Sequence, residues 1–252
     1  MLNVFSRPIL TVRIHSGLNA ESFLAGLLSV AGPAELFNLE DLLKSAFPRS
    51  KAHALLYPLS VNHIAGFSCR LDCPHEHVHR TPADIEAIYA NESALTPAAR
   101  EITRRIWSVI AHAEARVHDA CVEDVHFHEV GRMSNILAIG LIAEVFAAVN
   151  PIDFVCSPVP LGDGEVVCAH GVVTNPAPAL LSMIDGVAVK PFAGEGEAVT
   201  PTGLAILLGL GARFDCWPQM RVRRHATAFH NKKVFNGCAN GLLFALGDAL
   251  QS

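Results

Sequence analysis

Histidine is the residue type that first points to chemistry in this chain, because thirteen of its 252 residues are histidines and five of these lie in two short segments. The first segment, residues 74–79, reads PHEHVH. In an extended backbone alternate side chains point to the same side, so His75, His77 and His79 would share one face. Imidazole is a ligand for borderline metals such as nickel, zinc and copper. The segment therefore predicts a metal-binding tract, and the alternative is a solvated loop whose histidines bind nothing.

The second segment, residues 125–131, reads VHFHEVG. If it is extended, His126 and His128 face one way and Phe127 and Glu129 the other, and a turn at the glycine could bring Glu129 back. Two imidazoles and a carboxylate are a common ligand set for a divalent ion with open coordination positions. The alternative is that Phe127 belongs to the core and the histidines bond backbone carbonyls. We predict that the two segments fold together into one metal site.

Two further segments predict contacts with a substrate or a phosphate. His170 precedes a glycine, and residues 194–203 read GEGEAVTPTG, a glycine-rich loop that enters an apolar helix. Backbone N–H groups and hydroxyls at such a helix start can hold a phosphate or a carboxylate, although the Gly-Lys-Ser/Thr ending of a Walker A loop is missing. The alternatives are a structural histidine and an ordinary capped helix. The candidate residues are His170, Glu197, Thr200, Thr202 and Gly203.

The composition argues against several classes of protein. Hydrophobic residues make up 51% of the chain and charged residues 17%, which argues against disorder. The formal net charge of −5 argues against a nucleic-acid binder, which usually presents a basic face. No apolar run reaches the roughly 18 to 20 residues that cross a bilayer, and the first ten residues lack the apolar core of a signal peptide. Seven scattered cysteines form no disulfide framework, so we expect a reducing, cytoplasmic location.

The pattern of apolar residues predicts an α/β or α+β fold, in which a mixed sheet is packed by helices. Strands are expected over residues 8–14, 60–73, 153–159 and 220–229, and helices over residues 19–30, 35–47 and 131–149. Thr81-Pro82 and Thr96-Pro97 each combine a capping residue with a proline suited to the first helical turn. We therefore expect an inserted helical hairpin over residues 81–118. We also expect one domain over residues 1–252, with two lobes dividing near residue 150 as the alternative.

Several of these segments together resemble one family, the LarC-type nickel-insertion proteins of the lactate-racemase cofactor pathway. The most specific matches are VHFHEVG at residues 125–131 and TPTG at residues 200–203. Further matches are AEARVH over residues 113–118, VPLG over residues 159–162 and PAPA over residues 176–179. All of them are collinear with the family's pattern, so the resemblance covers most of the chain.

The resemblance implies a cytoplasmic protein that handles Ni²⁺. Members of this family use CTP to place nickel into a pyridinium bis-thiocarboxylate mononucleotide, a lyase-class cyclometallation that gives a nickel pincer cofactor. Carried over to this sequence, His126, His128 and Glu129 would face the metal, and the histidines of residues 75–79 would gather nickel. The turn at residues 200–203 would be a candidate phosphate site.

The chain also departs from the family's pattern. Family members are longer and carry a C-terminal domain that binds the nucleoside triphosphate, and we expect this chain to correspond to the N-terminal domain alone. The resemblance places two aspartates in the helix after VHFHEVG, where this chain has Ser134 and Ala138, and an earlier aspartate where it has Glu21. The loss of acidic groups beside a cation weakens charge compensation.

Three functions remain open on the sequence. The first is a nickel-binding module that acts in nickel insertion or delivery with a separate nucleotide-binding subunit, with a homo-oligomer as a further option. The second is a non-catalytic metallochaperone or scaffold, which the replacements at Ser134 and Ala138 favour. The third is a zinc-dependent hydrolase built on the same ligands. In each metal-binding case neutral imidazoles hold the ion, so binding should weaken as the pH falls through about 6.5.

Overall fold

A mixed sheet with strand order β2-β3-β10-β11-β1-β4-β9 forms the centre of the protein. It is seen in a computed structural model that describes residues 7–32, 38–76, 79–168, 171–194, 196–235 and 238–250. Its strands are β1 (Ile9–Ile14), β2 (His53–Val61), β3 (Ile64–Asp72), β4 (Asp153–Cys156), β9 (Arg213–Phe214), β10 (Met220–Phe235) and β11 (Cys238–Ala249). β1 pairs antiparallel with β11 and parallel with β4. Two small sheets pair β5 (Val159–Leu161) with β8 (Val189–Pro191) and β6 (Glu165–Cys168) with β7 (Gly171–Thr174).

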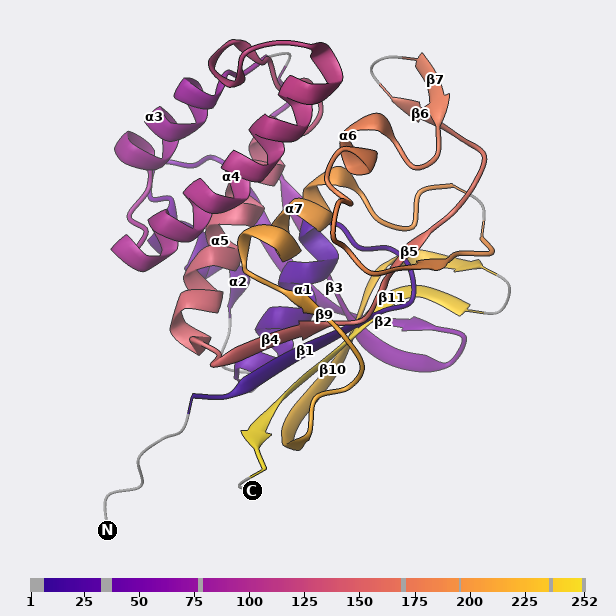
Figure 1. Ribbon diagram of the computed structural model, residues 1–252. Coiled ribbons are helices and arrows are strands. Elements are labelled where there is room, and N and C mark those ends of the chain that lie inside the picture. The colour runs from indigo at the N-terminus through magenta and orange to yellow at the C-terminus, as the bar shows by residue number, and fades with distance from the viewer. Residues whose placement is uncertain are drawn as a thin grey trace.

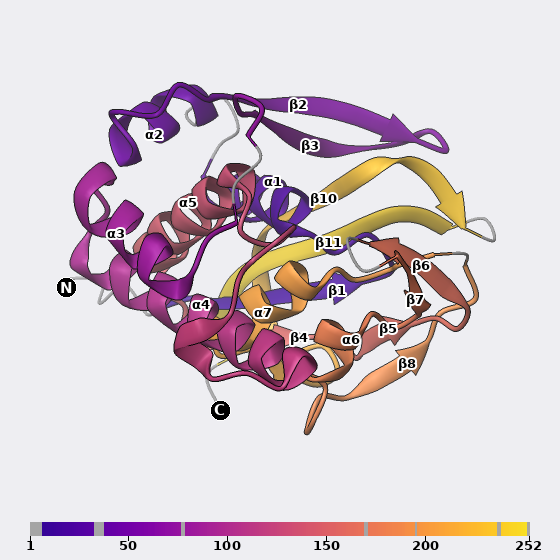
Figure 2. The same cartoon turned by 90° about the horizontal axis from the view of Figure 1, so that it is seen from above.

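The helices lie to one side of the sheet (Figures 1 and 2). They are α1 (Ala20–Ala31), α2 (Leu39–Ala46), α3 (Pro82–Glu92), α4 (Pro97–His118), α5 (Met133–Val149), α6 (Pro178–Leu181) and α7 (Pro201–Gly209), with a short 3₁₀ helix η2 at Val122–Asp124. α1 packs on β3, β10 and β11, and α5 packs beside α1. α4 covers α5 and α7 as the outer layer.

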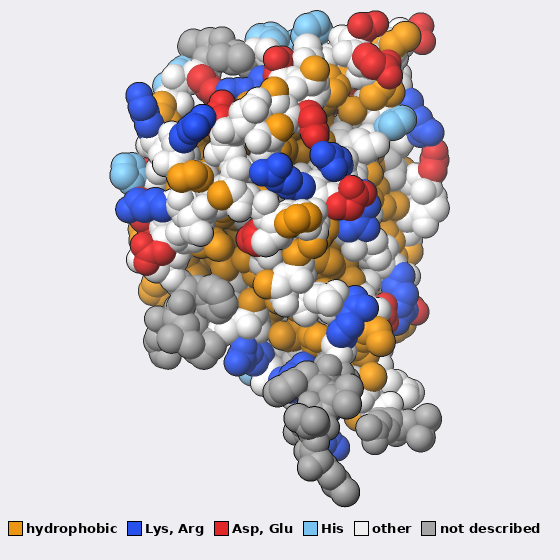
Figure 3. Space-filling model, turned by 90° about the vertical axis from the view of Figure 1, so that its left-hand side faces the viewer, with side chains coloured by type: hydrophobic (Ala, Val, Ile, Leu, Met, Phe, Trp, Pro, Cys, Tyr) orange, Lys and Arg blue, Asp and Glu red, His pale blue; other side chains and the backbone are white. Residues whose placement is uncertain are grey.

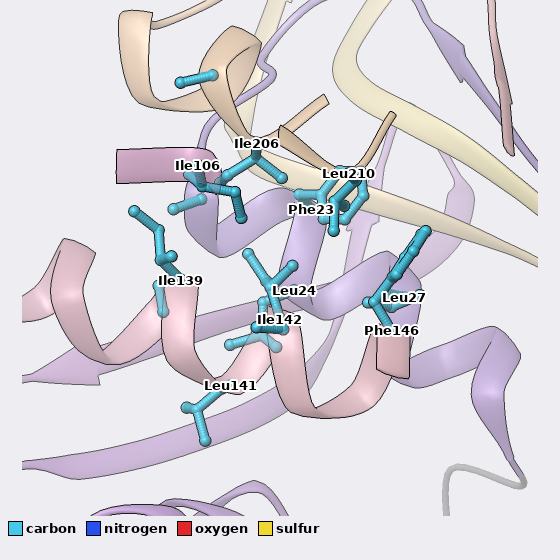
Figure 4. Close-up of a cluster of buried hydrophobic side chains, with 14 of the residues drawn as sticks. Phe23, Leu24, Leu27, Ile106, Ile139, Leu141, Ile142, Phe146, Ile206 and Leu210 are labelled. Atoms are coloured by element: carbon cyan, nitrogen blue, oxygen red, sulfur yellow. The ribbon is translucent and has the colours of Figure 1, made fainter. Parts of the chain in front are cut away.

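α5 is the helix around which the core is built. It is apolar and most of its residues are buried, as expected for a helix enclosed by other elements. Figure 4 shows Ile142 and Phe146 of this helix among side chains from α1, α4 and α7. Phe23 of α1 is fully buried, and its ring makes edge contacts with Phe154 and Phe244 at centroid distances of 6.2 and 5.4 Å. The core therefore fixes α1 and α5 against the sheet.

Three helices that matter for the site each have one N–H of the first turn bonded to a side-chain oxygen. The side chain of Asn19 accepts a hydrogen bond from the backbone N–H of Ser22 and so caps α1. Thr200 caps α7 in the same way. α5 has no such cap from its own preceding residue, and instead the N–H of Met133 donates to the carboxylate of Glu76, 2.8 Å away. The start of α5 thus depends on a residue from the first histidine segment.

The segment over residues 60–73 is not one strand, and this expectation from the sequence was wrong. β2 and β3 form an antiparallel hairpin that turns at Asn62 and His63, which have φ angles of 50° and 61°. Two consecutive residues with positive φ are typical of tight hairpin turns. Because the alternation of side chains continues through the turn, the pattern cannot reveal the reversal. The sheet therefore gains β2, a strand that the pattern does not predict.

The mixed sheet packed by helices confirms the predicted α/β fold, and α3 and α4 form the helical hairpin expected over residues 81–118. The single domain over residues 1–252 and its alternative of two lobes both stay predictions. β4, which follows residue 150, pairs with β1 in the central sheet. None of the described helices combines the length and the apolar character needed to cross a bilayer.

Phe23→Ala should lower the free energy of unfolding by about 3–5 kcal/mol, because it removes a fully buried ring and leaves a cavity. Urea unfolding followed by circular dichroism measures the change. The matched control is Leu55→Ala on β2, which is 52% exposed and should change the free energy by less than about 0.5 kcal/mol. Similar losses in the two variants would contradict the placement of α1 in the core.

Candidate functional site

A short backbone pairing joins the two histidine segments. The N–H of Phe127 donates to the carbonyl of Arg80 at 2.8 Å, and the N–H of Arg80 donates to the carbonyl of Phe127 at 3.4 Å. In an antiparallel pairing the residue before one partner lies opposite the residue after the other. His79 is therefore placed opposite His128, and one histidine of each predicted segment faces the other.

An ion pair holds this junction in place. The Nη1 and Nη2 atoms of Arg80 donate to the two carboxylate oxygens of Glu76 at 2.8 and 2.7 Å, and Nη1 also donates to the carbonyl of Gly131 at 2.8 Å. The side chain of Arg80 is only 9% exposed. Hydrogen bonding from Arg80 is the main cause that lowers the pKa of Glu76, with a smaller contribution from the N–H of Met133. The two segments and the start of α5 are thus tied together by one guanidinium group.

The rings of His79 and His128 are in edge-to-face contact, with their centroids 4.5 Å apart and an angle of 78° between their planes. The ring of His118, the last residue of α4, lies 6.3 Å from that of His128. On the sequence, His118 was only the end of the matching segment AEARVH and was not assigned to the metal site. The signal that could have found it is Glu114, one helical turn earlier, because such pairs at i and i+4 interact. We call His79, His118 and His128 the imidazole cluster.

The other predicted histidines lie apart from this cluster. His75 is exposed and lines a pocket of about 350 Å³ with Cys73, Glu76 and Ser134. His126 is exposed, and its position beside Thr81 follows from the pairing of Arg80 with Phe127. His77 and His170 lie outside the described residues. On the face shown in Figure 3, histidine side chains lie mostly in the upper part of the molecule.

Phe127, between His126 and His128, is fully buried, and its ring lies 5.4 Å from that of Trp107. This buried ring anchors the second segment to α4. As the side chains stand, no three His, Cys, Asp or Glu residues in the described part of the chain form a group that could hold a metal ion. The imidazole cluster is therefore an assembly of neighbouring rings rather than a finished coordination sphere.

Four of the other predicted residues share one pocket of about 280 Å³, which we call the acidic pocket. Its carboxylates are Glu21 from α1, Glu129 from the second histidine segment and Glu197 from the loop before α7. Its polar lining includes Asn19, Arg132, Ser134, Asn135, Thr200 and Thr202. The first turns of α1, α5 and α7 all reach this pocket, so three positive helix ends surround three carboxylates. Sequence reasoning noted Glu21 only as a departure and did not place it in a site.

Burial and charge repulsion shape the acidity of this pocket. Burial, followed by the nearby charge of Glu129, raises the pKa of Glu197 to about 7. Burial also raises the pKa of Glu21, although a hydrogen bond from the N–H of Leu71 opposes this effect. The one arginine of the lining, Arg132, approaches Glu129 only to 3.9 Å. The pocket therefore favours a cation or a proton among its carboxylates.

Thr200 and Gly203 have a structural role at the edge of the acidic pocket. The hydroxyl of Thr200 accepts from the N–H of Gly203 at 3.1 Å, and the N–H of Thr200 donates to the carbonyl of Leu18 at 2.9 Å. A Cβ atom on Gly203 would lie 2.5 Å from that same carbonyl oxygen. The tight contact holds the loop of Glu197 and the first turn of α7, which contains Thr202, against the start of α1.

The family model described as nickel insertion protein matches residues 10–249 of this chain. A protein from Geotalea daltonii whose name proposes nickel insertion is 32% identical over 243 residues, which cover 94% of this chain and 60% of that protein. A protein from Myxococcus xanthus with the same name is 34% identical over 203 residues, which cover 80% of this chain and 51% of that protein.

A third relative has a more specific name, the pyridinium-3,5-bisthiocarboxylic acid mononucleotide nickel insertion protein of Desulfitobacterium hafniense. It is 37% identical over 161 residues, which cover 64% of this chain and 40% of that protein. The chain spans about half the length of the curated relatives it matches. No solved structure matches the chain.

Glu76→Gln should lower the free energy of unfolding by about 3 kcal/mol at pH 7, because it leaves the nearly buried Arg80 without its charged partner. A lowered folded pKa contributes stability above the unfolded value near 4.3, and this is lost as the pH falls through the folded pKa. The difference in the free energy of unfolding between the variant and the wild type should therefore shrink below about pH 4. Urea unfolding at a series of pH values measures this difference. The control is Glu86→Gln, which removes an exposed ion pair with Arg104 and should lower the free energy of unfolding by less than about 1 kcal/mol. Equal losses in the two variants would contradict the role of Arg80.

Glu197→Gln should have the opposite pH dependence. A carboxyl whose folded pKa is raised to about 7 costs stability as the pH rises from about 4.3 to 7, because the folded protein resists its ionisation. The variant should therefore be more stable than the wild type by roughly 3 kcal/mol at pH 8 and equal to it at pH 4. Thermal unfolding at both pH values tests this, with Glu165→Gln on exposed β6 as the control. Parallel pH profiles for wild type and Glu197→Gln would rule out the raised pKa.

Proposed function

This chain belongs to the nickel insertion protein family, and we propose that it binds Ni²⁺ and brings it to a pyridinium bis-thiocarboxylate mononucleotide. The observation that carries this proposal is the contact between the rings of His79 and His128, 4.5 Å apart, beside the acidic pocket. Neutral imidazoles suit nickel, which they can hold while coordination positions stay open. The proposed substrate is the one in the name of the Desulfitobacterium hafniense relative.

The arrangement gives the metal and the substrate neighbouring places. In this proposal His79 and His128 bind Ni²⁺, and His75, His77 and His126 gather the ion from solution. Glu129 follows His128 directly and lines the acidic pocket, so it faces the ion from the pocket side. The thiocarboxylate sulfurs of the substrate then displace water from the open positions of the metal.

The acidic pocket suits a substrate that carries both signs of charge. Its carboxylates, Glu21, Glu129 and Glu197, attract the pyridinium ring, whereas the N–H groups at the helix starts attract the phosphate and thiocarboxylate groups. Thr202 contacts the substrate from the start of α7, and Thr200 and Gly203 fix that turn in place. We assign His170 to contacts with the substrate as well.

The insertion is a cytoplasmic, lyase-class cyclometallation that uses CTP. We assign the nucleotide chemistry to a separate nucleotide-binding subunit, and a homo-oligomer of this chain is the further assembly to examine. The family match supports this part of the proposal. The matched residues, 10–249, include both the imidazole cluster and the acidic pocket.

A second function, a metallochaperone without insertion activity, is favoured by one observation. Ser134 lies in the lining of the acidic pocket, at a place where the resemblance puts an aspartate. Ala138, the other replaced position, is fully buried one turn further along α5. The pocket therefore has fewer carboxylates than the family's pattern, and nickel binding without insertion is the expected result of that loss.

The proposed function predicts that the double variant His79→Ala, His128→Ala binds Ni²⁺ at least about tenfold more weakly than the wild type, because both rings are removed. Isothermal titration with NiCl₂ at pH 7.5 measures the affinity. His63→Ala, at the exposed turn between β2 and β3, is the matched control and should leave the affinity unchanged. Wild-type affinity in the double variant would overturn the proposal.

An insertion assay separates the enzyme from the chaperone. The chain is incubated with Ni²⁺, CTP, the mononucleotide and the nucleotide-binding portion of a relative, and mass spectrometry detects nickel in the product. Product that depends on this chain supports insertion, and nickel transfer to a second protein without product supports the chaperone. Gain of insertion in Ser134→Asp would assign the missing activity to the acidic pocket.

A further inference from the structure

His118 lies where the C-terminal end of α4 approaches the second histidine segment. It is the last residue of the helix, and its ring is 6.3 Å from that of His128 at an angle of 48°. The ring of His79 lies on His128 as well, 4.5 Å away. The rings of His79 and His118 therefore both lie beside that of His128, so three imidazoles from separate parts of the chain are neighbours.

These separations fit rings that share one ion. A metal–nitrogen bond is about 2.1 Å long, so a bound imidazole has its centroid roughly 3.2 Å from the ion, and two such rings have centroids about 4.5 to 6.4 Å apart, from cis to trans. Both measured separations lie within this range. Because the described side chains form no finished metal group as they stand, the rings must rotate about their side-chain bonds when the ion arrives.

Glu114 orients His118 from the same helix. Its Oε2 lies 3.5 Å from Nε2 of His118, and its side chain is only 11% exposed. A carboxylate that receives one ring N–H of a histidine fixes the ring and makes the other nitrogen a better ligand, an arrangement common behind metal-bound histidines. Because Nε2 lies toward Glu114, Nδ1 is the ring nitrogen that we assign to the metal.

We propose that His118, oriented by Glu114, is the third imidazole ligand of a nickel site formed with His79 and His128. This inference rests on the proposed function, since it names a further ligand for the same ion. In this proposal α4 contributes a metal ligand, because His118 is the last residue of the helix. Glu114 acts through His118 and is a positioning residue.

Titration with Ni²⁺ alone tests the ligand assignment. His118→Ala should weaken nickel binding about 10- to 100-fold, and Glu114→Gln, which keeps the size of the side chain, should weaken it about tenfold. The matched control is His112→Ala, an exposed histidine on the same helix whose Nδ1 bonds the carbonyl of Ser108 at 2.7 Å. It should bind nickel as the wild type does, and His118→Gln should behave as His118→Ala if the loss is due to the imidazole rather than to folding.

X-ray absorption of the nickel-loaded wild type gives a second readout that needs no variant. Three imidazoles are expected in the wild type and two in His118→Gln, whereas two or fewer in the wild type would overturn the assignment. Unchanged affinity in His118→Ala, together with loss of binding in the variant lacking His79 and His128, would also overturn it and leave the proposed function intact. Wild-type binding without both of those histidines would instead remove the proposed function.

Discussion

The buried guanidinium of Arg80 is the constraint on which the site depends. A cation that is only 9% exposed must keep its partners, because an unpaired buried charge costs several kcal/mol. Its partners, Glu76 and the carbonyl of Gly131, belong to the two histidine segments, and Glu76 also accepts from the first N–H of α5. The observed placement of the segments satisfies all these groups. That placement puts His79 opposite His128.

The core makes this junction rigid. α5 is enclosed by α1, α4 and the sheet, so its first residue is a fixed point against which both segments are held. The loop before α7 is tied to the backbone of Leu18, just before α1 begins. Three helix N-termini consequently meet at the acidic pocket, and their partial positive charges offset the repulsion among its carboxylates. The offset is incomplete, since the pKa of Glu197 is still raised to about 7.

The sequence predicted the elements better than the contacts among them. Thr-Pro pairs marked the starts of α3 and α4, because capping and proline are local effects. The hairpin of β2 and β3 was missed, because its turn leaves the alternation unchanged. The two histidine segments were recognised from composition, but extended geometry alone could not say which of their rings would meet. That outcome depends on the pairing of Arg80 with Phe127, 47 positions further along the chain, and on a salt bridge that no spacing rule reveals.

The imidazole cluster and the acidic pocket are joined by a single peptide bond, between His128 and Glu129. Neutral imidazoles do not cancel the charge of a metal ion, so a nickel ion held at the proposed site would keep its attraction for nearby carboxylates. In the proposed function the acidic pocket would supply that attraction through Glu129 and Glu197, and the pKa of Glu197 is raised to about 7. An aspartate at the fully buried position of Ala138 would need either a nearby cation or a bound proton to balance its charge. With alanine there, the protein has no buried carboxylate at that depth, and the carboxylates that line the acidic pocket are the charges that would attract the ion in the proposed function.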